Sequence, residues 1–233
     1  MLADKNHTIL ENQNYKKADF SNIATKQLTI INCSFEDCSF DDMKVGEICF
    51  GGGKSFSTYT NCSFKNAKFS SIAPGFAKFF GCTFSNVAIK KFLCTSVDII
   101  DCTFSGKIQG SFFNAKPISC NRPDGETKNT IESNDFSNVD FKDVAFRGGV
   151  DLSMQSLPSS EQSILLIGAE EILRNAYSKI ISWSDLELRR QCLNLIKFLE
   201  FELEDGQKDL FFTLSDFPKK QRDSVVELSR LIQ

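Results

Sequence analysis

The 233-residue sequence is poor in the side chains on which most catalytic and metal sites depend. It contains one histidine, His7, one tryptophan and three tyrosines. With His7 as the single imidazole, the sequence does not favour a Ser-His-Asp triad, a Cys-His nucleophile pair or a histidine-rich metal site. No spacing singles out a carboxylate pair or a Cys-x-x-Cys motif. We therefore expect no enzymatic activity, no catalytic residues, no metal, no cofactor and no small-molecule substrate.

Long apolar runs are also missing. The longest stretch of interest, 164–169, is far shorter than the roughly 20 residues that a transmembrane helix needs. The first residues do not form an apolar signal region. Nine cysteines are an odd number, which does not suit a closed disulfide framework. These features favour a cytoplasmic protein with reduced thiols and no membrane partner.

Phenylalanine, by contrast, is abundant and regularly spaced. Of 23 phenylalanines, 18 precede residue 151, and 13 of these lie on runs with a period of five. The residue two places earlier is small or apolar, and the one between is mostly polar, as in Cys33-Ser34-Phe35. This pattern fits neither a helix nor a simple alternating strand. Two inward side chains in every five residues predict a flat segment followed by a corner.

Cysteine and phenylalanine also recur at a longer interval. Four units of five residues, each ending in a corner, close a square coil of 20 residues. Stacked coils are expected at the usual strand separation of about 4.8 Å. Residues 20 apart then lie directly above one another. The cysteines are interpreted as small core residues rather than as a metal ladder. The predicted core columns are Cys62, Cys82 and Cys102, and Phe64, Phe84 and Phe104.

Several of these units resemble the pentapeptide-repeat family, whose unit is Ala-(Asp/Asn)-(Leu/Phe)-x-x. Examples are Ala18-Asp19-Phe20-Ser21-Asn22 and Val139-Asp140-Phe141-Lys142-Asp143. The resemblance covers residues 18–150, within a domain placed at 1–158, and it implies a right-handed quadrilateral β-helix, a mainly β solenoid. Cysteine and valine often replace alanine, and phenylalanine nearly excludes leucine. These departures affect core packing rather than architecture.

Two interruptions of the repeat predict loops, at about 51–58 and 119–129. The first contains Gly53-Lys54-Ser55, which resembles half of a phosphate-binding loop. Ile48 stands where the full motif needs glycine, and another repeat follows instead of a helix, so nucleotide binding is not expected. The second is rich in turn formers such as Pro123 and Gly125. Each loop is either a carrier of specificity or a tolerated insertion.

The periodicity becomes helical after the repeats, so residues 159–233 are expected to be α-helical. Apolar residues from Ile164 to Ile180 follow at helical spacing, and Ser184 and Glu187 suggest a capping box for a second helix running to Glu204. Pro218 precedes a third helix. This region is expected either to cap the open end of the solenoid, to form a separate bundle or to mediate a homodimer.

Charge is distributed unevenly along the repeats. Residues 1–150 carry 17 basic and 16 acidic side chains, whereas 151–233 carry a net charge of −4. An acidic segment, 36–47, precedes a stretch from 48 to 97 without any acid. Arginine is absent before Arg122 and no exposed aromatics interleave with the lysines, so nucleic acid is not the expected partner. The residues predicted to bind a partner protein are Lys54, Lys65, Lys68, Lys78, Lys90 and Lys91.

The family resemblance implies two functions for a non-enzymatic solenoid. Some pentapeptide-repeat proteins protect topoisomerases by mimicking DNA, which requires dense negative charge that this near-neutral solenoid lacks. Others resemble immunity proteins (antitoxins) that sequester a bacterial toxin. We expect a module that binds and blocks a partner protein, with the DNA mimic and a purely structural solenoid as alternatives. Lysines, loops and helices all remain candidate interfaces, as do the off-period aromatics Phe56, Phe76, Phe80, Phe92 and Phe112.

Overall fold

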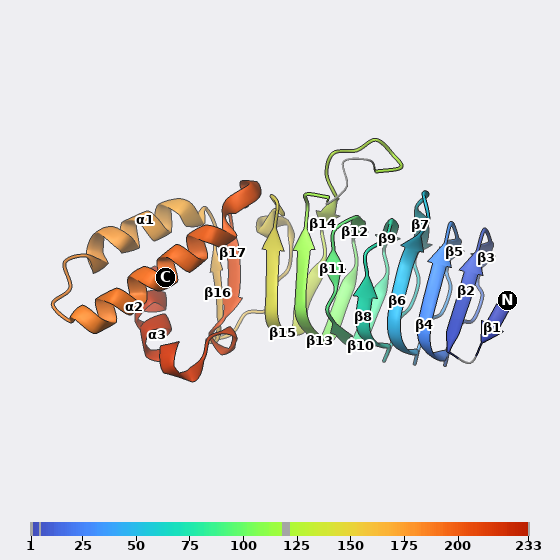
Figure 1. Ribbon diagram of the computed structural model, residues 1–233, viewed down its shortest axis with the longest axis horizontal. Helices are drawn as coiled ribbons and strands as arrows, with labels where there is room; N and C mark the ends of the chain where they lie inside the picture. Colours follow the sequence, from blue (N-terminus) through green and yellow to red (C-terminus); the bar gives the residue numbers. More distant parts are fainter. Residues whose placement is uncertain (1, 5, 118–121, 233) are drawn as a thin grey trace.

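Parallel strands stacked in register form most of the molecule. The computed structural model describes residues 2–4, 6–117 and 122–232. It contains a β-solenoid of about five turns, followed by a C-terminal region that includes the helices. The turns succeed one another along the long axis, from the N-terminus at one end to the helices at the other (Figure 1). The predicted β-solenoid is therefore confirmed.

Two parallel sheets form the walls of the solenoid. The smaller sheet consists of β3 (Asn14–Lys16), β5 (Ser34–Glu36), β7 (Ser57–Thr60), β9 (Ala77–Phe80), β12 (Val97–Ile100) and β14 (Ile131–Glu132). The larger sheet consists of β2 (His7–Glu11), β4 (Ala24–Ile31), β6 (Lys44–Gly52), β8 (Lys68–Ala73), β10 (Thr83–Lys90), β11 (Leu93–Cys94), β13 (Thr103–Asn114) and β15 (Asp135–Arg147). β1 (Leu2–Asp4) joins β2 in antiparallel orientation.

The pairing register reveals the length of each coil. Thr83 pairs with Thr103, an offset of 20 residues, as the sequence predicts. The offset grows to 24 between Ser34 and Thr58, and to 32 between Ile99 and Ile131. The extra residues are extruded, and the strands on either side return to register. Both interruptions of the repeat are thus insertions into an otherwise regular coil; residues 119–121 of the second lie outside the described residues.

The corners depend on residues that tolerate a positive φ. Asp37 and Asp42 follow the central phenylalanines Phe35 and Phe40 by two places, with φ of 54° and 57°. Most side chains clash with the backbone in this region, whereas Asn and Asp enter it readily. The corner residues of these two types are Asn12, Asn22, Asn32, Asp37, Asp42, Asn61, Asn66, Asn86, Asp101 and Asp143. Asp37 and Asp42 of the acidic segment are therefore explained by the backbone conformation of the corners.

Aromatic rings stack along the inside of the solenoid. Adjacent rings in the longer column are separated by 4.5 to 5.0 Å between centroids, with nearly parallel planes. This separation is within the range of offset stacking, which adds to the free energy of burial. The longer column contains Phe20, Phe40, Phe64, Phe84, Phe104 and Phe136, and a second contains Tyr15, Phe35, Tyr59 and Phe79.

Cysteines occupy the small inward position beside these rings. Cys62, Cys82 and Cys102 are each 1% exposed. The Sγ of Cys82 donates to the backbone oxygen of Tyr59 in the preceding coil at 3.3 Å. The structure thus places these thiols in the core, and all eight described cysteines are free.

The C-terminal region combines a two-stranded antiparallel sheet with helices. β16 (Ser163–Leu166) pairs with β17 (Leu210–Thr213). The helices are α1 (Ala169–Ile180), α2 (Leu186–Glu202) and α3 (Arg222–Ile232), with short 3-10 segments η1 (Leu152–Met154), η2 (Glu204–Gly206), η3 (Leu214–Asp216) and η4 (Lys219–Gln221). None of the described helices is long and apolar enough to cross a membrane.

Two local expectations for this region were wrong. Helical spacing placed Ile164 at the start of the first helix, but 163–166 is strand β16, because Ile164 and Leu166 are buried while Leu165 is 45% exposed. The second helix begins one residue later than the capping-box interpretation. Asp185, rather than Ser184, is the N-cap, and its carboxylate accepts from the backbone N–H of Leu188 at 2.9 Å.

β17 joins the two parts of the molecule. Phe211 belongs to the solenoid core and packs against Phe141 of the last coil, at 5.8 Å between centroids. Its neighbours Leu210 and Phe212 belong to the helical core. The Gln207 side chain accepts from the backbone N–H of Val150 at 3.0 Å. The C-terminal region therefore covers the last coil, whose strand edge would otherwise be open.

The aromatic column predicts where substitution is most damaging. Phe84 is 4% exposed and stacks between Phe64 and Phe104. Phe84→Ala is expected to lower the free energy of unfolding by about 3–5 kcal/mol, because it removes a ring from a packed core. Urea denaturation measures the loss. Phe80→Ala, which removes a half-buried ring outside the column, is the matched control and is expected to cost about 1 kcal/mol. Equal losses would show that the column does not dominate core packing.

Candidate functional site

The two insertions of the solenoid meet on one side of the molecule. Phe56 belongs to the first insertion, and Arg122 to the second, which projects beside β12 and β9 (Figure 1). The guanidinium carbon of Arg122 lies 4.9 Å from the centroid of the Phe56 ring, and the ammonium of Lys78 lies 4.4 Å from it. Cation–π contacts thus connect segments 66 residues apart in the chain.

A buried ion network holds the second insertion in place. Arg122 is 4% exposed, and its Nη2 lies 2.8 Å from Asp98 Oδ2 and 2.9 Å from Asp124 Oδ2. Asp98, 3% exposed, also accepts from the backbone N–H of Thr130 at 2.8 Å, and Lys78 Nζ is 3.3 Å from it. Hydrogen bonds from Arg122 hold the pKa of Asp124 well below its usual range. We call this group, with Phe56, the insertion clasp.

The six lysines predicted to bind a partner do not form one surface. Lys68 lies on β8 and pairs with Lys44 of β6, whereas Lys90 lies on β10 and pairs with Gln109 of β13. Lys91 takes a corner, with φ of 52°. Lys78 belongs to the insertion clasp, so its charge is already compensated.

The remaining two lysines are separate from these. Lys54 is exposed on the first insertion. Lys65 is exposed as well, and its backbone N–H donates to Asp41 Oδ1 at 2.7 Å. A run that is continuous in the sequence is divided because residues five apart occupy different faces of the coil.

Of the five off-period phenylalanines, Phe92 is buried and the other four are half-buried. Phe92 is 5% exposed, and Phe56 and Phe76 pack edge to face at 5.6 Å between centroids. Exposed phenylalanines are found instead on α2, where Phe198 and Phe201 are 53% and 59% exposed. Sequence analysis missed them, although a helical wheel would have identified them. The buried residues of α2 define one face, and both phenylalanines fall outside it.

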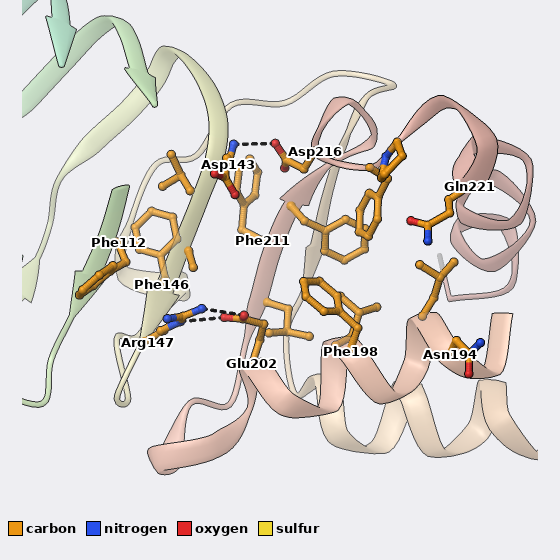
Figure 2. A pocket seen from close by; sticks show the side chains of 18 of the residues that line it. Phe112, Asp143, Phe146, Arg147, Asn194, Phe198, Glu202, Phe211, Asp216 and Gln221 are labelled. Atoms are coloured by element: carbon orange, nitrogen blue, oxygen red, sulfur yellow. Dashed lines mark hydrogen bonds and ion pairs between the residues drawn. The ribbon is translucent and has the colours of Figure 1, made fainter. Parts of the chain in front are cut away.

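A cleft of about 840 Å³ lies between the end of the solenoid and α2. One wall comes from β13 and β15 and includes Phe112 and Val144; the other comes from α2 and includes Leu195, Phe198 and Leu199. β17 lies between the two walls (Figure 2).

Polar contacts cross the cleft at its two ends. Arg147 forms a bidentate ion pair with Glu202, at 2.7 and 2.8 Å. At the other end, Asp216 Oδ1 accepts from the backbone N–H of Asp143 at 2.7 Å (Figure 2). These contacts fix the helical region against the last coil, so the cleft has rigid walls.

No protein-family model matches the sequence, and no curated protein matches it either. The architecture is nevertheless clear: parallel coils are stacked, most of them offset by 20 residues, and many units have a residue at positive φ two places after the centre. The chain folds as a parallel β-solenoid with coils stacked about 20 residues apart, an arrangement consistent with a pentapeptide-repeat β-helix.

The structure shows two features of the candidate metal ligands and thiols in this β-solenoid. Among residues 2–4, 6–117 and 122–232, no three His, Cys, Asp or Glu side chains are grouped as a metal ion would require. Burial raises the pKa of Cys192 to about 11, and it also raises that of Cys94. Such thiols are poorly ionised at neutral pH and are weak nucleophiles. The arrangement suits binding through surfaces.

The insertion clasp predicts a large effect for one substitution. Arg122→Ala removes the nearer of the two cations beside the buried carboxylate of Asp98 and leaves it with Lys78 and the Thr130 N–H, so the free energy of unfolding is expected to fall by about 3 kcal/mol. Limited proteolysis is expected to cleave within 117–129 faster in the variant, and urea denaturation measures the stability. Arg174→Ala, which breaks an exposed pair with Glu170, is the control and should leave both unchanged. A wild-type rate of cleavage in Arg122→Ala would contradict the clasp.

Proposed function

We propose that this protein is a non-enzymatic binding module that engages and blocks a partner protein, in the manner of immunity proteins of bacterial toxin systems. The observation that supports this function best is the cleft beside α2, with Phe198 exposed on its wall. Exposed aromatic side chains beside a concave surface are frequent anchors of protein interfaces.

Exposed apolar side chains are concentrated in the C-terminal region. Of nine large hydrophobic residues exposed in the described chain, seven lie between 165 and 201. Of the other two, Leu93 lies on the solenoid strand β11 and Met154 lies on η1. The seven are Leu165, Ile167, Tyr177, Ile181, Leu186, Phe198 and Phe201. This distribution favours an interface on the C-terminal region over one on the solenoid faces.

A rigid scaffold suits a blocking function. The solenoid coils are tied by strand pairing, and the cleft walls are joined at both ends by the contacts of Arg147 and Asp216. A preformed surface loses little conformational entropy on binding, so more of the contact energy appears as affinity. The lysines of β6, β8 and β13 lie along the solenoid, which disfavours mimicry of DNA.

Growth rescue tests the function. The gene product encoded beside this protein is expressed in a bacterial host, with and without the wild-type chain. We expect wild type to restore growth and to co-purify with that product, and Phe198→Ala/Phe201→Ala to reduce both at least tenfold. Lys68→Ala/Lys90→Ala, on the solenoid strands β8 and β10, is the control and should rescue fully. Failure of wild type to bind or to rescue would contradict the function; loss of rescue only in the lysine variant would move the interface to the solenoid.

A further inference from the structure

The cleft beside α2 has a strand edge at its base. β17 pairs with β16 along one edge, and no strand of the described chain pairs with its other edge. Leu210, Phe211 and Phe212 of β17 all line the cleft, although each is at most 8% exposed. Figure 2 shows β17 running through the cleft from the end at Glu202 to the end at Asp216.

The hydrogen-bond pattern determines which backbone groups point into the cleft. In antiparallel pairs, successive residues direct their N–H and C=O to opposite edges of the strand. The backbone N–H of Leu214 donates to Gln162 O at 2.9 Å, so Leu214 faces the β16 side. By alternation, Leu210 and Phe212 also face β16, whereas Asp209, Phe211 and Thr213 face the free edge.

The backbone groups of Thr213 and Asp209 that face the free edge already have hydrogen-bond partners within the chain. The Thr213 N–H donates to Asp216 Oδ2 at 2.8 Å, and Asp209 O accepts from Gln207 Nε2 at 2.8 Å. Among the described residues, no such partner is found for the N–H and C=O of Phe211. A backbone donor and acceptor that are buried at the base of a cleft are favoured to pair with another backbone.

We propose that the cleft binds an extended peptide segment of the partner protein, which adds to the free edge of β17 as a third strand and pairs with the Phe211 peptide groups. This inference rests on the proposed function and specifies how the partner is recognised. A helix in the same cleft would leave the Phe211 groups unpaired, because its own backbone bonds are internal. Only an extended segment offers both complementary groups.

The walls specify the side chains of that segment. Side chains of an added strand alternate between the two faces of the sheet. One face of β17 is turned to the solenoid, as Phe211 shows, and the other to the helices, as Phe212 shows. The apolar lining residues include Phe112 and Val144 on one wall and Leu195 and Leu199 on the other, among polar residues at the ends of the cleft. The segment is therefore a short run of consecutive apolar residues, and the β-branched types suit its conformation.

A displayed library of random ten-residue peptides provides the probe. Selection on the full-length protein is expected to enrich apolar runs, and the strongest peptide is then synthesised. Its binding should slow hydrogen exchange of the Phe211 amide at least tenfold, as followed by NMR. N-methylation of the peptide at one backbone position should weaken binding at least tenfold, because it removes the N–H that pairs with Phe211 O.

A matched pair of variants locates the binding. Phe198→Asp, on the cleft wall, should weaken peptide binding at least tenfold, whereas Phe201→Asp, equally exposed on the same helix but outside the cleft lining, should not. Absence of any enriched peptide that discriminates these variants would overturn the inference. Cleft binding that tolerates N-methylation at every position and leaves Phe211 exchange unchanged would also overturn it, in favour of a helical ligand. The growth-rescue assay tests the proposed function independently of the peptide experiments. A failure of peptide binding therefore contradicts strand addition without contradicting the proposed function.

Discussion

The need to turn a corner every five residues governs this molecule. Many corners place one residue at positive φ, and Asn or Asp occupies most of the non-glycine sites of this kind. Once the corners are set, the inward positions follow two residues earlier. Stacking on adjacent coils follows from the 20-residue offset that most coils share and to which the strands return after each insertion. The asparagines even extend the stack outside the core: Asn86 Nδ2 donates to Asn66 Oδ1 at 2.8 Å, and Asn66 Nδ2 to Asp42 Oδ1 at 3.0 Å.

Sequence periodicity predicted the solenoid because repetition along the chain becomes repetition in space. Phe64 and Phe84 could be placed from their spacing alone, and the two insertions appeared as breaks in that spacing. The same logic misled where residues were close only in sequence. The lysines between 48 and 97 look like one basic segment, but Lys78 is compensated within the insertion clasp while Lys68 lies on another wall.

Contacts between segments that lie outside the five-residue repeat could not be predicted from the sequence. The pairing of Asp98 with Arg122 depends on how an insertion folds back, and no spacing rule describes that path. β16 and β17 are 44 residues apart at their nearest paired ends, so Ile164 and its neighbours gave a helical signal in isolation. The cleft combines β13, β15, α2 and β17, and only the assembled fold brings them together.

β17 also has a consequence for the order in which the chain acquires its structure. Its side chains are divided between two cores, with Phe211 in the solenoid and Phe212 in the helical region. A nascent chain can stack its early coils as they emerge, because each coil needs only its predecessor. The final coil differs, since its covering strand is made about 60 residues later. Until then its edge stays open, and completion of the solenoid and assembly of the helices become a single cooperative step.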